Sequence, residues 1–348
     1  MTSSSTFSDR LLIWFDLYGR KDLPWQQNPT PYQVWLSEIM LQQTQVSSVI
    51  PYYQRFTNTF PDIKALANAS MDDVLALWTG LGYYARARNL HKTARIMIAE
   101  HQGDMPLTLE QLLALPGIGR STAGAIMTLA HHQNFPILDG NVKRVLTRYF
   151  AISGWPGNKK IEDQLWLKAT QLLPKTRIAN YIQAQMDLGA TLCTRSKPDC
   201  EHCPLNIDCQ AWQQGNVTSY PTPKAKKLIP TRQTNWLIAQ SIDNKILLQQ
   251  RPTHGIWGGL WSFPEISNQD NIELCYNQFN IDVTSIINRP VIHHVFTHFK
   301  LDIQPHILRC TVTSNKIAEN KNLVWYKISD ALKLGLPSPV KSFIQTLQ

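Results

Sequence analysis

The sequence of 348 residues contains no apolar run that approaches the ~20 residues needed for a membrane-spanning helix. Its first nine residues lack both the basic start and the apolar core of a secretory signal. No repeat of fixed period stands out. We therefore expect a cytoplasmic protein, associated with the nucleoid, that has no membrane partner.

Acidic residues are in the minority: 25 Asp and Glu stand against 34 Lys and Arg, which gives a net charge of +9 and a pI near 9.2. This balance favours a polyanionic partner, although many proteins are mildly basic without one. The apolar share of 43% is ordinary for a globular protein. At ~150 residues per domain, the chain is long enough for two domains.

Cysteine is also scarce, and four of the six cysteines lie close together as Cys193-x6-Cys200-x2-Cys203-x5-Cys209. In a reducing compartment, such a group indicates a metal site rather than disulfides. Zinc and an iron–sulfur cluster are both held by four thiolates, and the residues alone leave the two open. Cys275 and Cys310 are interpreted as ordinary buried thiols.

An apolar helix is predicted from Pro31, which suits a first helical turn. Tyr32, Val34, Trp35, Leu36, Ile39, Met40 and Leu41 cover nearly every side of it, so the helix should be buried. Glu38 stands in its middle. Burial should raise the pKa of this carboxyl toward the range of a general acid. The alternative is a core carboxylate paired with an Arg or Lys elsewhere.

Two further stretches favour contact with nucleic acid. Residues 81–90 combine Gly82, Tyr83 and Arg86 at the start of a predicted helix, which suits a surface that follows a DNA backbone and inserts a side chain between bases. The alternative there is an amphipathic helix with a solvated basic face. Residues 112–128 resemble a helix-hairpin-helix motif, whose second helix we expect to open at Ser121 or Thr122.

In that motif, Gly117, Ile118 and Gly119 would form the turn, and its N–H groups would grip a phosphate without reading sequence. A plain helical hairpin is the alternative. Asp139 and Asn141 follow, just before an apolar-periodic helix. Either could be a simple N-cap. A second carboxylate after the hairpin, in a chain that already buries Glu38, could instead divide acid and charge-stabilising roles with it at a glycosidic carbon.

The pattern changes along the chain. Residues 7–220 read as mostly helical, with Asp9 capping a first helix that ends at Gly19. Strands are predicted at 236–241, 245–251, 291–301 and 306–312, and a helix at 339–347. We expect an all-α domain over residues 1–218, a proline- and lysine-rich linker over 219–230, and a smaller α+β domain over 231–348.

Together these motifs resemble the MutY-type adenine DNA glycosylases of the helix-hairpin-helix superfamily. The likeness runs from about Leu11 to Gln348 and is strongest before the linker. It is carried by residues 31–46, 82–90, 115–123 and 138–145 and by the cysteine loop 193–209, whose spacing is typical of a [4Fe–4S] cluster in this superfamily. The C-terminal part resembles a Nudix-like module that senses 8-oxoguanine.

The resemblance implies an enzyme that flips adenine out of duplex DNA where it is mispaired with 8-oxoguanine or guanine, and hydrolyses its glycosidic bond as a monomer. Glu38 would be the general acid, Asp139 would stabilise the oxocarbenium-like sugar, and Asn141 would support the site. The resemblance also assigns residues that contact DNA, the base or the cluster: Trp25, Leu41, Gln43, Tyr83, Arg86, Gly117, Ile118, Gly119, Ser121, Gln183, Phe296, Thr297 and His298, with Cys193, Cys200, Cys203 and Cys209 as cluster ligands.

Ser121 stands where related enzymes that cut the DNA backbone carry a Schiff-base lysine, so weak or absent lyase activity is expected. Lys143 could react adventitiously. The C-terminal module keeps Gly259 and Glu265 of a Nudix box, but residues 273–278 lack the Arg-Glu pair and the later Glu-Glu pair of that box, so the module should bind rather than hydrolyse. A pyrimidine glycosylase like endonuclease III and a non-enzymatic iron–sulfur DNA sensor are the competing hypotheses.

Overall fold

The computed structural model describes residues 5–27, 29–225, 228–267, 272–273, 279, 281–312 and 322–347. Internal contacts divide the chain into two compact units, of which the first joins Met1–Ala67 to Lys92–Lys226 and the second joins Asn68–His91 to Lys227–Gln348. A short helical piece is thus grouped with the C-terminal part of the chain. Within the described ranges, no helix is long and apolar enough to cross a membrane.

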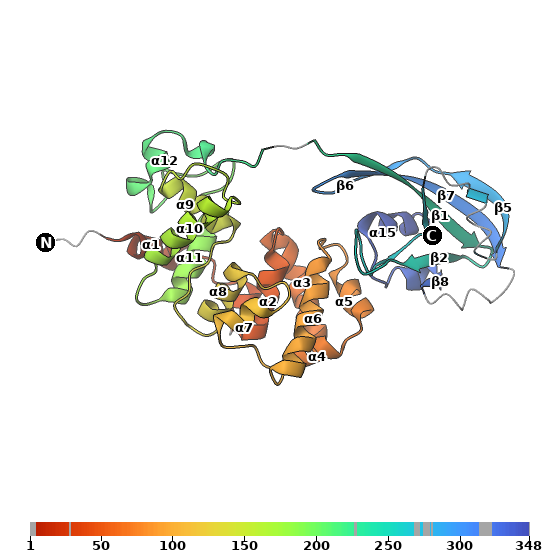
Figure 1. Ribbon diagram of the computed structural model, residues 1–348, viewed down its shortest axis with the longest axis horizontal. Helices are drawn as coiled ribbons and strands as arrows, with labels where there is room; N and C mark the ends of the chain where they lie inside the picture. The colour runs from red at the N-terminus through yellow and green to blue at the C-terminus, as the bar shows by residue number, and fades with distance from the viewer. Residues whose placement is uncertain are drawn as a thin grey trace. The chain divides into compact units, whose positions relative to one another are not determined.

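The first unit is built of helices, as predicted (Figure 1). Helix α6 (Ala85–Glu100) begins in the second unit and continues into the first. The other helices of the first unit are α1 (Phe7–Tyr18), η1 (Pro24–Gln26), α2 (Pro31–Leu41), α3 (Val46–Thr59), α4 (Ile63–Asn68), α7 (Leu109–Ala114), α8 (Arg120–Leu129), α9 (Gly140–Tyr149), α10 (Lys159–Gln171), α11 (Ile178–Thr191), η2 (Asn206–Asp208), α12 (Gln210–Gln213) and η3 (Val217–Ser219).

Capping boxes begin two of these helices. At α1 the N-cap is Thr6, whose hydroxyl accepts from the Asp9 N–H at 3.2 Å, while Asp9 accepts from the Thr6 N–H at 3.0 Å. The prediction that Asp9 itself is the cap is therefore wrong, because Asp9 fills the third helical position of the box. Gly19 ends α1, as predicted. Thr30 and Gln33 form the same reciprocal pair at the start of α2.

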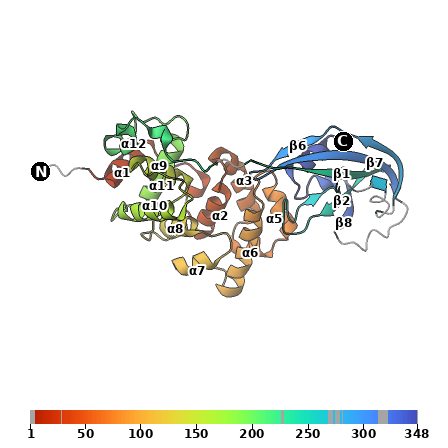
Figure 2. The ribbon, with the colours of Figure 1, turned by 45° about the horizontal axis from the view of Figure 1, so that its top comes forward.

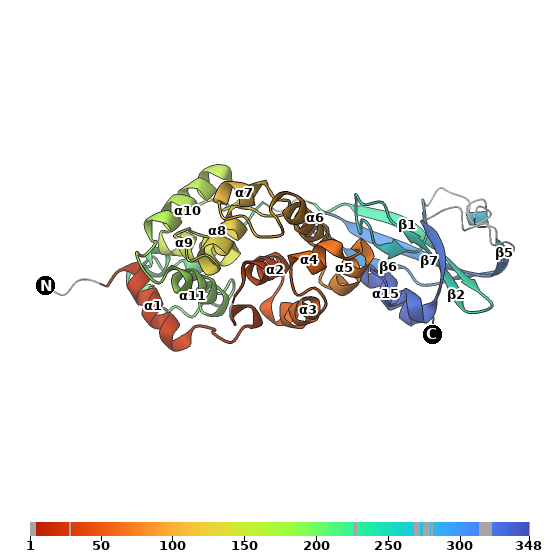
Figure 3. The same ribbon diagram turned by 90° about the horizontal axis from the view of Figure 1, so that it is seen from below.

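Helix α11 lies at the centre of the helical core. It packs against α1, α8 and α9, and α8 packs in turn against α2 (Figure 3). Fully buried side chains from three of these helices meet there, including Leu11 of α1, Leu146 of α9 and Tyr181 of α11. This packing brings the start of α8, the start of α9 and one face of α11 around α2.

The second unit contains a mixed sheet with strand order β3-β2-β1-β7-β5, in which β4 also pairs with β1, β6 with β7, and β8 with β2. Strands β1 and β7 are parallel and lie side by side over their length (Figure 2). The elements are α5 (Met71–Trp78), β1 (Thr231–Ser241), β2 (Lys245–Gln250), β3 (Trp261–Ser262), β4 (Glu265–Ile266), β5 (Ile281–Asn288), β6 (Ile292–Val295), β7 (Lys300–Val312), β8 (Leu323–Lys327), α14 (Ile328–Ala331) and α15 (Ser338–Gln345).

The strand predictions need several corrections. Strand β1 begins at Thr231, five residues before the predicted start, and β3, β4, β5 and β8 were not predicted. The predicted strand 291–301 is two strands, β6 and the start of β7, separated by residues 296–299. Strand β7 runs without the predicted break around Pro305. Pro305 cannot donate to a ladder, but its carbonyl accepts from the Arg289 N–H at 3.0 Å, so the strand continues through it. Cys310 is buried, as predicted, whereas Cys275 lies outside the described residues.

Candidate active site

A cleft of about 690 Å³ lies in the first unit. Its walls come from segments far apart in the sequence: the stretch before η1, α2, the starts of α8 and α9, and one face of α11. The predicted site residues that line it are Trp25, Glu38, Leu41, Gln43, Ser121, Asp139, Asn141 and Gln183. The fold therefore brings the predicted carboxylates and the predicted base-pocket residues into one place.

Glu38 is the carboxylate of α2 that faces this cleft. Its neighbours Ser37 and Ile39 are buried, whereas Glu38 is half-buried. Among the described residues, no ion pair or hydrogen bond holds its carboxyl, so the alternative of a paired core carboxylate has no partner there. Burial, and after it the negative charge of Asp139, raise the pKa of Glu38 from 4.5 to about 8. At neutral pH this side chain can therefore donate a proton.

Asp139 is both the N-cap of α9 and a wall of the cleft. One carboxylate oxygen accepts from the Val142 N–H at 2.7 Å, and the other accepts from the Asn141 Nδ2 at 3.1 Å. Burial raises the pKa of Asp139, while these two hydrogen bonds act in the opposite direction. The same carboxylate therefore caps α9 and lines the cleft, so the capping role does not exclude a role in the chemistry.

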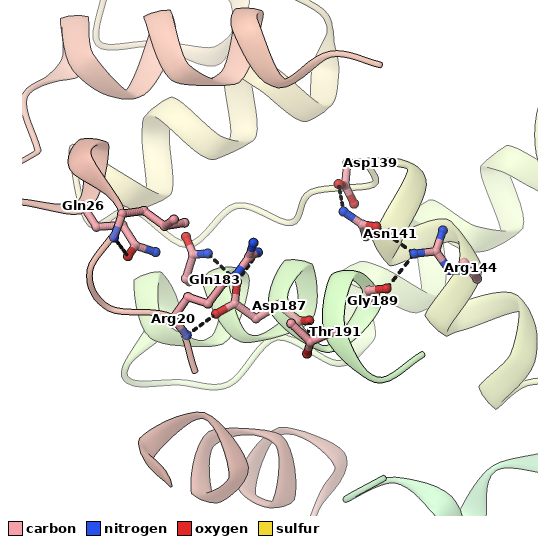
Figure 4. A network of polar contacts seen from close by, with 10 residues as sticks. Arg20, Gln26, Asp139, Asn141, Arg144, Gln183, Asp187, Gly189 and Thr191 are labelled. Atoms are coloured by element: carbon pink, nitrogen blue, oxygen red, sulfur yellow. Dashed lines mark hydrogen bonds and ion pairs between the residues drawn. The ribbon is translucent and has the colours of Figure 1, made fainter. Parts of the chain in front are cut away.

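A chain of polar contacts holds Asn141 in place (Figure 4). Its Oδ1 accepts from Arg144 Nη2 at 2.8 Å, and the same nitrogen donates to the Gly189 carbonyl at 2.7 Å. Gly189 is required at this crossing, since a Cβ there would lie 2.5 Å from the Cβ of Asn141. Because Gly189 of α11 has no side chain, the start of α9 can approach α11 closely.

Ser121 supports the segment that leads into Asp139. It is the second residue of α8, which begins at Arg120, one residue before the predicted start. The Ser121 hydroxyl accepts from the Leu138 N–H at 3.1 Å. This side chain therefore fixes the backbone immediately before the carboxylate.

The sequence reasoning missed two residues at the cleft, Arg20 and Asp187. Asp187 is fully buried on α11 and binds both the backbone and the side chain of Arg20, which lines the cleft. The two residues are separated by 167 positions, so no local pattern joins them. The only available signal was the four-residue spacing of Asp187 from Gln183, in a part of the chain predicted to be mostly helical.

Gln43 and Tyr83, the predicted side chains for the base stack, lie in different units. Both have the left-handed backbone conformation that is rare outside glycine, with φ of 58° at Gln43 and 49° at Tyr83. Gln43 is exposed, and Tyr83 is 45% exposed. Such strain is typical of functional positions that the surrounding structure holds in place.

Arg86 differs from the expectation of a side chain that faces DNA. It is only 8% exposed, and its Nη2 donates to the carbonyls of Leu81 and Gly82 at 3.2 and 3.1 Å. Its guanidinium also lies over the rings of Trp78 and Tyr83. Arg86 therefore stabilises the turn that presents Tyr83, because the carbonyls of this turn need donors that the buried guanidinium supplies.

The hairpin has the geometry that its glycines predict. Gly117 has φ of 81°, and Gly119 is the N-cap of α8 without a side-chain capping bond. Ile118 is buried and anchors the turn, while Gly117 and Gly119 are exposed. The turn therefore leaves the first N–H groups of α8 accessible to an anion.

The four clustered cysteines line one small cavity between α9, α11 and the loop that follows α11. Arg148 of α9 is 1% exposed, and its Nη1 donates to the Cys193 Sγ at 3.2 Å and to the Thr194 carbonyl at 2.7 Å. Within the described ranges, no three His, Cys, Asp or Glu side chains are grouped so that they could hold one metal ion. The iron–sulfur cluster therefore stays a prediction. The cavity that the four cysteines share is consistent with it.

In the second unit, Phe296, Thr297 and His298 form the turn between β6 and β7. Phe296 stacks on Phe299 with ring centroids 4.6 Å apart and also contacts His294 and Trp257, while Thr297 and His298 are exposed. A cluster of aromatic side chains thus supports two exposed polar side chains.

The retained Nudix-box carboxylate, Glu265, is held by two protein side chains. Glu265 forms an ion pair with Arg251 and accepts from the Trp236 indole at 3.4 Å. Glu273 is described, but residues 274–278 lie outside the described ranges.

Comparisons with known proteins agree with this arrangement. Residues 36–171 match the model of the HhH-GPD superfamily base excision DNA repair proteins, and residues 235–346 match the NUDIX domain. A solved thermostable thymine-DNA glycosylase superposes with a TM-score of 0.55 and 27% identity over 60% of this chain and 95% of that chain. A non-covalent endonuclease III–DNA complex shares the fold, with a TM-score of 0.51 and 20% identity over 60% of this chain and 94% of that one. The fold and the cleft define a DNA glycosylase of the helix-hairpin-helix superfamily.

Relatives that match over the full length narrow this class. The adenine DNA glycosylase of Buchnera aphidicola subsp. Acyrthosiphon pisum is 41% identical over 98% of this chain and 97% of its own length. The adenine DNA glycosylase of Rattus norvegicus is 35% identical over 94% of this chain and 75% of its own length. The chain belongs to the adenine DNA glycosylase family, enzymes of base excision repair. The predicted family, fold class and enzyme class are thereby confirmed.

Proposed function

We propose that this enzyme removes adenine from A:8-oxoguanine and A:G mispairs in duplex DNA by hydrolysis of the glycosidic bond. The observation that carries the proposal is one cleft lined by two carboxyl side chains, Glu38 and Asp139. Burial, and after it the charge of Asp139, raise the pKa of Glu38 there to about 8. A base in the duplex stack cannot reach such a cleft, so the adenosine must be flipped out.

Glu38 would protonate the departing adenine, because its carboxyl keeps its proton at neutral pH. Asp139 would face the positive charge that develops on the sugar, and Asn141 would orient it through the 3.1 Å hydrogen bond. Trp25, Leu41 and Gln183 would contact the base. This division uses two carboxyls in different environments for two different roles.

Gln43 and Tyr83 would enter the base stack beside the flipped nucleotide, and Gly117, Ile118 and Gly119 would hold a phosphate. Arg86 would act indirectly, through the Tyr83 turn. The exposed Thr297 and His298 on their aromatic support would contact the 8-oxoguanine. In this proposal the C-terminal module binds the damaged guanine and hydrolyses no pyrophosphate, which the pairing of Glu265 with Arg251 supports.

Strand cleavage would be weak or absent. The position after the hairpin carries Ser121, whose hydroxyl is engaged by the Leu138 N–H. Lys143, the nearby lysine, donates to Glu162 Oε1 at 2.6 Å. A Schiff base needs a lysine amine that can reach the sugar, and this amine is held in the ion pair with Glu162.

One assay separates this proposal from the two competing hypotheses. Duplexes carrying A:8-oxoguanine, A:G, A:T or thymine glycol are incubated with the enzyme, and free base and strand breaks are measured. We expect adenine from the first two duplexes only, with breaks appearing after alkali. Release of an oxidised pyrimidine with direct breaks would favour the endonuclease-III-like hypothesis, and binding without any release would favour the DNA sensor.

We further propose that Cys193, Cys200, Cys203 and Cys209 hold a [4Fe–4S] cluster. Their common cavity and the buried Arg148 beside Cys193 support this assignment, since a guanidinium stabilises thiolate charge. The cluster would order the loop that follows α11 and take no part in the bond cleavage.

The purified enzyme should therefore contain iron and inorganic sulfide in equal amounts, four of each per chain, and should show a visible charge-transfer band. Removal of the iron with a chelator and a reductant should bleach the band and lower the melting temperature, because metal binding stabilises the folded loop. One zinc per chain and a colourless protein would contradict the assignment.

A further inference from the structure

Asp187 is a buried carboxylate of α11 that no part of the proposed chemistry uses. Its side chain has 0% exposure, whereas its ion-pair partner Arg20 is 25% exposed on the wall of the cleft. A buried charge is retained only where several hydrogen bonds compensate its lost hydration. The identity of those donors indicates what Asp187 does.

Four hydrogen bonds to Asp187 come from residues that line the cleft (Figure 4). Asp187 Oδ2 accepts from the Arg20 backbone N–H at 2.7 Å. Its Oδ1 accepts from Arg20 Nε at 2.9 Å, from Arg20 Nη2 at 2.6 Å and from Gln183 Nε2 at 2.9 Å. The carboxylate therefore joins two walls of the cleft.

The contact with Gln183 decides the direction of its amide. A carboxylate without a proton only accepts hydrogen bonds, so the NH2 group of Gln183 must face Asp187 and the Oε1 must lie on the other side. Gln183 is half-buried and lines the cleft, and within the described ranges its Oε1 has no hydrogen-bond partner. Asp187 thus turns Gln183 into a fixed acceptor at the cleft.

The contact with Arg20 fixes a second wall. Because both its backbone and its guanidinium are held, the chain is anchored just before the turn that carries Trp25 into the cleft. Gln26 closes that turn by accepting from the Leu23 N–H at 3.3 Å. Loss of Asp187 would therefore also loosen the wall of the cleft that carries Trp25, an effect that adenine and purine meet alike and that cancels in the ratio of their rates.

We infer that Asp187 is a positioning residue that makes the cleft selective for a base with an exocyclic amino group, by directing the Gln183 carbonyl oxygen at it. The inference rests on the proposed function. A site that fixes an acceptor discriminates against a base that lacks the matching donor, since the buried acceptor is then left unpaired. Without Asp187 the amide can rotate, and this discrimination is lost.

The test is a double-mutant cycle of Asp187→Asn and Gln183→Leu in the intact enzyme. Single-turnover base release is measured from duplexes carrying adenine or unsubstituted purine, which lacks the amino group, opposite 8-oxoguanine. We expect each single variant to lower the adenine-to-purine rate ratio about tenfold, the size expected for one lost hydrogen bond. The double variant should show the ratio of the Gln183→Leu variant, because Asp187 acts through Gln183.

Gln185→Met is the matched control. Gln185 is buried on the same helix and donates to the Tyr181 hydroxyl at 3.0 Å, away from the cleft, so this variant disturbs α11 and should keep the wild-type ratio. An unchanged ratio in Asp187→Asn, or independent effects that add in the double variant, would overturn the inference and leave the proposed function standing. A wild-type enzyme that releases neither base would overturn both.

Discussion

Replacement of Glu38 by Gln should lower the rate of adenine release by about 10²- to 10⁴-fold, the usual contribution of a general acid. The glutamine side chain has nearly the same size and can still donate a hydrogen bond, but it cannot transfer a proton. Binding to the A:8-oxoguanine duplex should be retained. The measurement is single-turnover release of free adenine, together with a binding isotherm for the same duplex.

The same variant should also be more stable than the wild type at neutral pH. The pKa of Glu38 is raised from 4.5 to about 8 on folding, so its contribution to the free energy of unfolding is full below pH 4.5 and is lost as the pH rises toward 8. An amide at this position does not titrate and has no such dependence. Melting temperatures of Glu38→Gln and wild type should therefore diverge as the pH increases from 5 to 8.

A matched control is Glu100→Gln, the same chemical change at the exposed end of α6. It should keep the wild-type rate and melting temperature. Substantial release of adenine by Glu38→Gln would reject Glu38 as the acid, and a lower melting temperature at pH 8 would contradict its description as a destabilised carboxyl.

Replacement of Asp139 by Asn should lower the rate by about 10²- to 10³-fold, because the negative charge that faces the developing oxocarbenium ion is removed. The helix should remain intact, since Asn is as good an N-cap as Asp. The charge of Asp139 also contributes to the raised pKa of Glu38. In Asp139→Asn the pKa of Glu38 should therefore be lower, so the residual rate should begin to fall at a lower pH than the wild-type rate.

The measurement is the single-turnover rate of Asp139→Asn between pH 5 and 9, with circular dichroism to verify the helical content. Asp163→Asn is its control, because Asp163 is exposed on α10 and its ion pair is with Lys159 of the same helix. If Asp139→Asn kept more than a tenth of the wild-type rate, Asp139 would be a helix cap and nothing more.

Several features of the candidate sites could be predicted from the sequence. The apolar surroundings of Glu38 in one short helix, the position of Asp139 before α9 and the spacing of the four cysteines are local patterns, and the local interactions behind them survive in the fold. Tyr83 was also selected from its local pattern, and Gln43 through the family resemblance, although the residue types did not predict the left-handed backbone of either residue. Residues chosen by local chemistry are those that sequence reasoning finds most readily.

The rest depends on contacts between distant segments. Arg20 and Asp187 meet across 167 positions, and neither has a local motif. The sequence around Arg86 is typical of an arginine that faces DNA, but its guanidinium donates to carbonyls of the preceding turn. The unbroken β7 follows from its parallel pairing with β1, which overrides the local preference of Pro305. These features were missed because tertiary partners decide them.

The central claim is that a protonated Glu38 drives departure of the base, and the pH dependence of the wild-type rate tests it most directly. Single-turnover release of adenine from the A:8-oxoguanine duplex should fall about tenfold for each pH unit above a pKa near 8. The slow residual reaction of Glu38→Gln should lack this decline. A wild-type rate that stays constant from pH 6 to 10, or the same decline in Glu38→Gln, would contradict the claim.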